Sequence, residues 1–160
     1  MDNELFEIAQ QLGRLLKLNE KKIATAESCT GGWIAQVITE VSGCSAWFDR
    51  GFVTYSNAAK MQILGVNSET LDKFGAVSAE TATEMVNGAL AHSDADCAIA
   101  VTGIAGPDGG TAEKPVGTVF IAWAYKNKSV KVIQQKLTGN RHEIRRQTVK
   151  IALEGVEIGQ

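Results

Sequence analysis

A hydroxyl-rich turn that ends in two glycines is the first part of the sequence whose residue types could do chemistry. Residues 27–32 read ESCTGG, and the apolar stripe of a predicted helix begins directly after them at Trp33. The first N–H groups of a helix have no intrahelical partner, so they attract a phosphate or an oxyanion. Ser28 is therefore a candidate nucleophile, although Ser28 or Thr30 could serve only as a helix cap. The turn is neither a Walker loop nor a GxSxG nucleophile elbow.

A phenol and an amine stand close together after the predicted strand at residues 52–54. Tyr55 and Lys60 are a little over one helical turn apart, and residues 58–64 have the composition of a short helix. A lysine on such a helix is usually a solvated surface charge. To act as a general base, Lys60 needs burial that lowers its pKa from about 10.4 towards about 7–8.

The third candidate segment is a glycine-rich loop at residues 102–110, which follows a strand of small apolar residues at 97–101. Its glycines allow a ligand to approach the backbone closely, but the same composition suits a flexible connection. In an α/β sheet, ligands usually bind at the loops that follow the strands. All three segments are therefore candidates for a binding site.

Histidine and metal chemistry have little support in this sequence. His92 and His142 are far apart and lack neighbouring ligand residues, so we expect no metal site and no Ser-His-Asp triad. A lysine-based dyad is the better candidate. Cys29, Cys44 and Cys97 are an odd number of cysteines without CxxC spacing, which indicates a reducing cytoplasm.

Helical and strand patterns alternate along the chain, which is typical of an α/β fold. The last two strands are separated only by residues 126–128, so they should form an antiparallel hairpin, and Asn140 with Glu143 makes a capping box for the last helix. We predict a single three-layer α/β/α domain with a mixed sheet over residues 1–160. Helices are expected at 5–19, 33–41, 58–64, 78–90 and 140–152, and strands at 22–26, 52–54, 97–101, 116–125 and 129–137.

Charge and hydropathy argue against two classes of protein. The 160 residues carry a formal net charge of −2 and have a pI near 5.7, so the chain lacks the basic balance of a nucleic-acid-binding protein. No run approaches the ~18 apolar residues of a membrane span, and the N-terminus has no signal-peptide pattern. We expect a cytoplasmic protein that binds neither nucleic acid nor a membrane.

Four segments together resemble the CinA C-terminal-domain family, the nicotinamide-nucleotide amidases. They follow the family's order over nearly the whole chain, at residues 26–32 (AESCTGG), 55–60 (YSNAAK), 101–107 (VTGIAGP) and 114–119 (KPVGTV). The resemblance implies hydrolysis of nicotinamide mononucleotide to nicotinate mononucleotide and ammonia, without a cofactor. It implies Ser28 as the nucleophile, Lys60 as its general base and Tyr55 as a proton-relay or positioning residue.

The oxyanion and the substrate phosphate need separate sites under this hypothesis. We assign the oxyanion to the backbone N–H groups of Thr30, Gly31 and Gly32, which then are not free to hold the phosphate. The phosphate is expected at one of two places, and the sequence leaves open which: the loop with Thr102, Gly103, Ala105 and Gly106, or the pair Arg141 and Arg145, one helical turn apart. Both arginines could instead be solvated helix charges.

Several alternatives remain open at this point. Cys29 is a rival nucleophile, but it matches a cysteine of the family motif and should pack beneath the turn. Asn140 stands where the family pattern has an aspartate, which keeps the cap and loses a charge. We expect none of the activities of the extra N-terminal domain found in longer family members. The function alternatives are an amidase for another carboxamide, an inactive nucleotide-binding paralogue and, with least support, a DNA-associated competence factor. A homodimer is unsurprising if one of Trp33, Trp47 and Trp123 is exposed.

Overall fold

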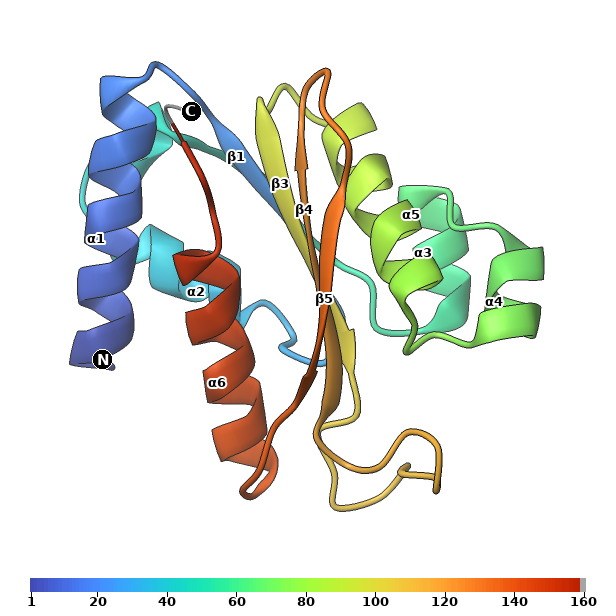
Figure 1. Ribbon diagram of the computed structural model, residues 1–160. Coiled ribbons are helices and arrows are strands. Elements are labelled where there is room, and N and C mark those ends of the chain that lie inside the picture. Colours follow the sequence, from blue (N-terminus) through green and yellow to red (C-terminus); the bar gives the residue numbers. More distant parts are fainter. Residues whose placement is uncertain (159–160) are drawn as a thin grey trace.

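The computed structural model describes residues 1–158 and consists of one central sheet with helices on both faces (Figure 1). The strands are β1 (Ile23–Glu27), β2 (Phe48–Val53), β3 (Cys97–Gly103), β4 (Thr118–Tyr125) and β5 (Lys131–Lys136). The helices are α1 (Asn3–Leu18), α2 (Trp33–Thr39), α3 (Asn57–Leu64), α4 (Ser68–Phe74), α5 (Ala79–Ala91) and α6 (Arg141–Glu154), with a 3₁₀ turn at Cys44–Ala46.

The sheet has the strand order β2-β1-β3-β4-β5 and is mixed. Strands β2 and β3 run parallel to β1 on its two sides, whereas β4 pairs antiparallel with β3, and β5 pairs antiparallel with β4. Helices α1, α2 and α6 cover one face, and α3, α4 and α5 cover the other (Figure 1). The expected three-layer α/β/α architecture with a mixed sheet is confirmed.

The two faces of the sheet differ in the size of their side chains. The face towards α1, α2 and α6 carries large residues such as Ile99, Ile121 and Trp123. The opposite face is mostly alanine, at Ala24, Ala26, Ala98, Ala100, Ala122 and Ala124. Small side chains let a helix approach closely, and α5 packs directly on this alanine face, with α3 and α4 against α5. The position of α3, which carries Lys60, is therefore set through α5.

The sequence patterns located most elements within a few residues and missed two features. Helix α4 was not predicted, because its seven residues bury only Leu71. Its N-terminal groups are satisfied by Glu84 of α5, whose carboxylate accepts from the N–H of Asn67 and the hydroxyl of Thr70, at 2.8 and 2.5 Å. Strand β2 begins at Phe48 rather than at residue 52, because an edge strand with exposed residues lacks a clear apolar pattern. The capping box of Asn140 and Glu143 is confirmed.

Two further expectations concern surfaces. Within residues 1–158, no helix is long and apolar enough to cross a membrane. Trp47 and Trp123 are buried, so of the three tryptophans only Trp33 is partly exposed. The expectation of a homodimer stays a prediction.

Candidate active site

The three candidate segments meet at one edge of the sheet. Strands β1, β2 and β3 are parallel, so the turn after β1, the segment after β2 and the loop after β3 all leave the sheet at its carboxyl edge. The chain passes from β1 outward to β2 by way of α2 on one face and returns to β3 by way of α5 on the other (Figure 1). Such a change of direction between neighbouring strands is where open α/β sheets bind ligands.

Ser28 and Lys60 lie in direct contact at this edge. Lys60 Nζ is 2.9 Å from Ser28 Oγ, although the two residues are 32 positions apart in the chain. The Lys60 side chain is 1% exposed and Ser28 is 8% exposed, so both are shielded from water. The Ser28 backbone is fixed by its N–H, which donates to the Val101 carbonyl of β3 at 3.1 Å.

Two backbone carbonyls complete the surroundings of the Lys60 amine. Nζ also donates to the carbonyl oxygens of Thr54 and Tyr55, each at 2.9 Å. None of the amine's hydrogen-bond partners is a carboxylate. Burial lowers the pKa of Lys60 from its ordinary 10.5, since desolvation disfavours the ammonium form. Burial therefore shifts the Lys60 pKa in the direction that a lysine base requires.

The turn that carries Ser28 is closed from inside by Glu27, a residue to which the sequence assigned no role. The Glu27 side chain is 1% exposed and accepts hydrogen bonds from Thr30 Oγ1 at 2.6 Å, the Ile34 N–H at 2.8 Å and the Ala35 N–H at 3.1 Å. Burial raises the pKa of the Glu27 carboxyl, and these hydrogen bonds oppose the rise. The N-terminus of α2 is thus occupied by a side chain of the protein itself.

The hydrogen bonds within the turn reduce the number of backbone N–H groups that could bind an oxyanion. The Gly31 N–H donates to the Ser28 carbonyl at 3.0 Å, so it is already engaged within the turn. The N–H groups of Cys29 and Thr30 have no partner among residues 1–158. The Gly32 N–H is directed at the Glu27 carboxyl, whose pKa it helps to lower. Of the three amides named from the sequence, Thr30 therefore remains a candidate donor, and Cys29 joins it. The presence of the acidic residue Glu27 directly before the turn could have indicated from the sequence that the first amides of α2 are already occupied.

Arg145 holds the same turn from outside. Its guanidinium donates to the carbonyls of Cys29 and Thr30, both at 3.0 Å, and lies over the Trp33 ring at 5.3 Å from its centroid. The sequence suggested that Arg145 pairs with Arg141 to clamp a phosphate. The structure does not present two free guanidinium groups, because Arg145 is engaged with the backbone of the turn.

Arg141 and Tyr55 lie together at the mouth of the site. Arg141 donates to the Gly106 carbonyl at 2.7 Å and to the Tyr55 hydroxyl at 3.1 Å. Tyr55 is 61% exposed, and its hydroxyl is bound to Arg141 rather than to Ser28 or Lys60. The tyrosine is connected to the Ser28–Lys60 pair by its backbone carbonyl, which accepts from Lys60.

The loop after β3 forms the opposite wall of a small cavity. Thr102 is buried, and its hydroxyl donates to the Ala76 carbonyl at 2.8 Å. Lys114 donates to the carbonyls of Phe74 and Val77, so the loop is attached to the segment before α5. The cavity has a volume of about 160 Å³ and is lined by Ser28, Cys29, Tyr55, Lys60, Ala76, Val77, Thr102, Gly103, Ala105 and Arg141.

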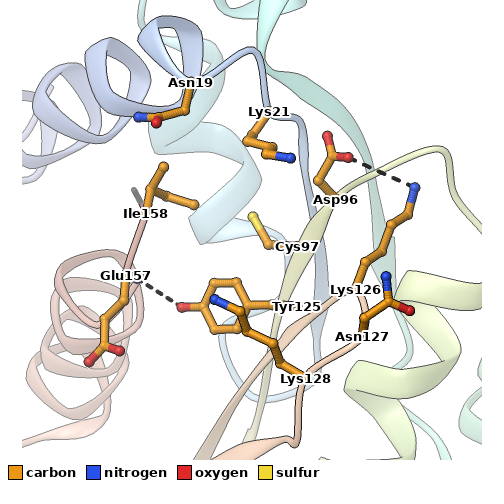
Figure 2. Close-up of a pocket in the computed structure, with 10 residues that line it drawn as sticks. All are labelled: Asn19, Lys21, Asp96, Cys97, Tyr125, Lys126, Asn127, Lys128, Glu157 and Ile158. Carbon is orange, nitrogen blue, oxygen red and sulfur yellow. Dashed lines mark hydrogen bonds and ion pairs between the residues drawn. The ribbon is translucent and has the colours of Figure 1, made fainter. Parts of the chain in front are cut away.

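A larger cavity, of about 370 Å³, lies at the other end of the sheet (Figure 2). It contains Lys126, paired with Asp96 at 3.8 Å, and Tyr125, whose hydroxyl accepts from the Glu157 N–H at 2.8 Å. Burial raises the pKa of Cys97 in its floor to about 12, so this thiol is a poor nucleophile. The smaller cavity is therefore the better candidate active site. Within residues 1–158, no three His, Cys, Asp or Glu side chains gather as metal ligands would.

A buried serine hydroxyl against a lysine amine, at the carboxyl edge of parallel strands, has the geometry of a hydrolytic α/β enzyme. The model of the CinA C-terminal domain matches residues 5–158, so the chain belongs to this family. It is 50% identical over 153 residues to the nicotinamide-nucleotide amidohydrolase PncC of Escherichia coli K12, covering 96% of this chain and 93% of that protein.

Two more comparisons agree with this membership. The Pseudomonas putida protein named nicotinamide-nucleotide amidohydrolase PncC is 50% identical over 149 residues, which cover 93% of this chain and 92% of that protein. The crystal structure of the competence/damage inducible protein CihA from Agrobacterium tumefaciens superposes with a TM-score of 0.93 at 50% identity, covering 94% and 92% of the two chains.

Proposed function

We propose that the protein is a nicotinamide-nucleotide amidohydrolase, which converts nicotinamide mononucleotide and water into nicotinate mononucleotide and ammonia, with Ser28 as nucleophile and Lys60 as general base. The relatives that carry this name are about 50% identical over more than nine tenths of both chains, which supports the substrate. The contact between Ser28 and Lys60 carries the mechanism.

When the Lys60 amine is neutral, its three hydrogen-bond partners determine which way its lone pair points. A neutral amine has two N–H groups and one lone pair, and a carbonyl oxygen accepts hydrogen bonds but donates none. The carbonyls of Thr54 and Tyr55 therefore take the two N–H groups. The lone pair is left facing Ser28 Oγ, the only one of the three oxygens that carries a proton. The neutral amine is thus aligned to accept the serine proton.

The reaction proceeds in two halves. Ser28 Oγ attacks the carboxamide carbon while its proton passes to Lys60, and the tetrahedral intermediate forms. The C–N bond then breaks, and the proton held by Lys60 passes to the leaving nitrogen, which departs as ammonia. Water attacks the resulting acyl-enzyme while its proton passes to Lys60. The Ser28 ester bond then breaks, Lys60 returns that proton to Ser28 Oγ, and the carboxylic acid is released.

The amides of Cys29 and Thr30 serve as the oxyanion donors in this scheme. Loss of one such donor typically costs about 2.7–4 kcal/mol in the activation barrier. The substrate phosphate lies near Arg141, because this exposed guanidinium stands at the mouth of the cavity, beside the Gly106 carbonyl of the loop. Arg145 supports the turn instead of binding the phosphate.

The test is ammonia release from nicotinamide mononucleotide by the wild-type protein, Ser28→Ala and Lys60→Met, with free nicotinamide as the control substrate. We expect turnover of the nucleotide by the wild type alone, and loss of turnover in both variants. Turnover of free nicotinamide at an equal rate would favour an amidase for another carboxamide. Tight binding of the nucleotide without ammonia release would favour an inactive paralogue, and activity in Ser28→Ala would exclude the serine nucleophile.

A further inference from the structure

The turn of residues 28–32 is held between two groups of opposite charge. The Glu27 carboxylate binds it on the inner side, through Thr30 Oγ1 and the first amides of α2. The Arg145 guanidinium binds it on the outer side, through the carbonyls of Cys29 and Thr30. The positions of both groups are themselves restricted. Glu27 is buried, and the Arg145 guanidinium packs over the Trp33 ring.

The turn needs these contacts from Glu27 and Arg145 because its two glycines allow its backbone several conformations. Gly31 and Gly32 have φ values of 62° and 102°, a region that glycine enters freely but does not prefer over its other conformations. The hydrogen bond from the Gly31 N–H to the Ser28 carbonyl closes the turn only locally. Without an external restraint, the Ser28 side chain and the amide of Thr30 would share this freedom.

Glu27 is built to act as a carboxylate at this place. Its partners, the Thr30 hydroxyl and the N–H groups of Gly32, Ile34 and Ala35, all donate, so no partner calls for a proton on the carboxyl. Its own backbone is fixed to the neighbouring strand end, because the Thr54 N–H donates to the Glu27 carbonyl at 2.9 Å. That same Thr54 gives its carbonyl to Lys60. Glu27 therefore connects the nucleophile turn with the segment that holds the base.

We propose that Glu27, with Thr30 as its link, is a positioning residue that keeps Ser28 Oγ in reach of Lys60 Nζ. In this proposal the Thr30 hydroxyl links the turn to Glu27, while the Thr30 N–H keeps its proposed role as an oxyanion donor. The inference rests on the proposed function only in taking Ser28 and Lys60 as the reacting pair. Misplacement of a reacting group by about 1 Å can cost 100-fold in rate, so loss of this restraint should lower kcat by about 10- to 100-fold. KM should change much less, because neither side chain faces the mouth of the cavity, where the nucleotide enters.

The experiment compares Glu27→Gln and Thr30→Val with Thr30→Ser, which restores the hydroxyl donor. Thr148→Val is the matched control, since it also removes a buried threonine hydroxyl with one hydrogen bond, here to the Ile144 carbonyl of α6 at 2.8 Å. Each variant is measured for Tm, for kcat and KM with nicotinamide mononucleotide, and for the rate at which a fluorophosphonate labels Ser28, followed by intact mass. In that reaction the Oγ–P bond forms, fluoride leaves and the serine proton passes to Lys60.

We expect Glu27→Gln and Thr30→Val to lose kcat and labelling rate in parallel, and Thr30→Ser to recover both. Thr148→Val should lower Tm without lowering kcat. The inference is overturned if folded Thr30→Val or Glu27→Gln labels and turns over as the wild type does, or if Thr148→Val loses as much kcat. Thr30→Val keeps the test decisive if Glu27→Gln does not fold.

The labelling reaction separates this inference from the proposed function. A wild type that is labelled at Ser28 but releases no ammonia from the nucleotide contradicts the proposed substrate, while the labelling rates of the variants still decide the role of Glu27. A wild type that is not labelled at Ser28 overturns the positioning role together with the nucleophile.

Discussion

A methyl group added at Gly88 should separate Lys60 from Ser28, the proposed catalytic pair, without touching either residue. Gly88 lies on the buried face of α5, and a Cβ there would stand 2.0 Å from the Leu64 carbonyl oxygen of α3, whereas real Cβ contacts are essentially never under 3.0 Å. Relief of the clash needs a shift of at least 1.0 Å, the difference of those two distances. Because α5 is packed on the sheet and α3 packs on α5, the helix that moves is α3.

Lys60 lies one helical turn before Leu64, so a shift of α3 moves the amine away from Ser28 Oγ, now 2.9 Å from it. We expect Gly88→Ala to lower kcat by about 10- to 100-fold. The overpacking should also lower the free energy of unfolding by about 1–3 kcal/mol, partly offset by the higher helix propensity of alanine, about 1 kcal/mol. A loss of that size corresponds to a fall in Tm of roughly 2–4 °C per kcal/mol.

Gly155→Ala is the matched control for this prediction. Its Cβ would meet the Trp123 ring at 2.1 Å, so it creates a comparable clash at the other end of α6 from Arg141. Both variants are assayed by ammonia release from nicotinamide mononucleotide and by thermal unfolding. The reasoning is refuted if Gly88→Ala loses stability but keeps the kcat of the wild type, or if Gly155→Ala loses as much kcat.

Three further predictions concern titration and stability. Because burial lowers the pKa of Lys60 below its ordinary 10.5 and the neutral amine is the proposed base, kcat/KM should rise with pH to a plateau well below that value; a rise that is still incomplete near pH 10.5 contradicts it. Burial raises the pKa of the Cys29 thiol to about 11, so Cys29→Ala should keep most of its turnover, and a loss as large as that of Ser28→Ala would restore Cys29 as the nucleophile. Asp2 caps α1 and pairs with Arg146 at 2.6 Å, so Asp2→Ala should lower the free energy of unfolding in urea by about 1–2 kcal/mol at neutral pH. Hydrogen bonding to Arg146 lowers the pKa of Asp2 from 3.8 to about 2, so this difference should shrink as the pH falls through that interval, and a constant difference would argue against the ion pair.

The parts of the site that could be predicted from the sequence are those that depend on local pattern. Ser28 follows a buried strand, and Lys60 lies on a short helix after the next strand. Parallel strands place their carboxyl ends at one edge, so alternation of helices and strands was enough to suggest neighbouring loops. The contact between the two side chains, however, depends on how close α3 stands, and that distance is set by glycine and alanine on α5 and the sheet.

Other features depend on contacts that no local pattern contains. Arg145 reads as a surface charge or a phosphate ligand, and only the fold shows that the turn after β1 lies within its reach. Glu27 reads as the end of a strand, although its partners are as many as eight residues further along the chain. Helix α4 obtains its N-terminal acceptor from Glu84, a residue of another helix. Short elements of this kind are stabilised by tertiary contacts rather than by their own propensity.

The antiparallel pairing of β3 with β4 places the turn between β4 and β5 far from the candidate active site. Tyr125 at the end of β4 pairs with Cys97 at the start of β3, so the turn to β5 leaves the sheet at the edge opposite to Ser28. Residues 126–129 in that turn are exposed, and exposed polar turns tolerate inserted sequence well. A tag or a second protein domain placed there would anchor the protein to a support with the cavity beside Ser28 facing the solution.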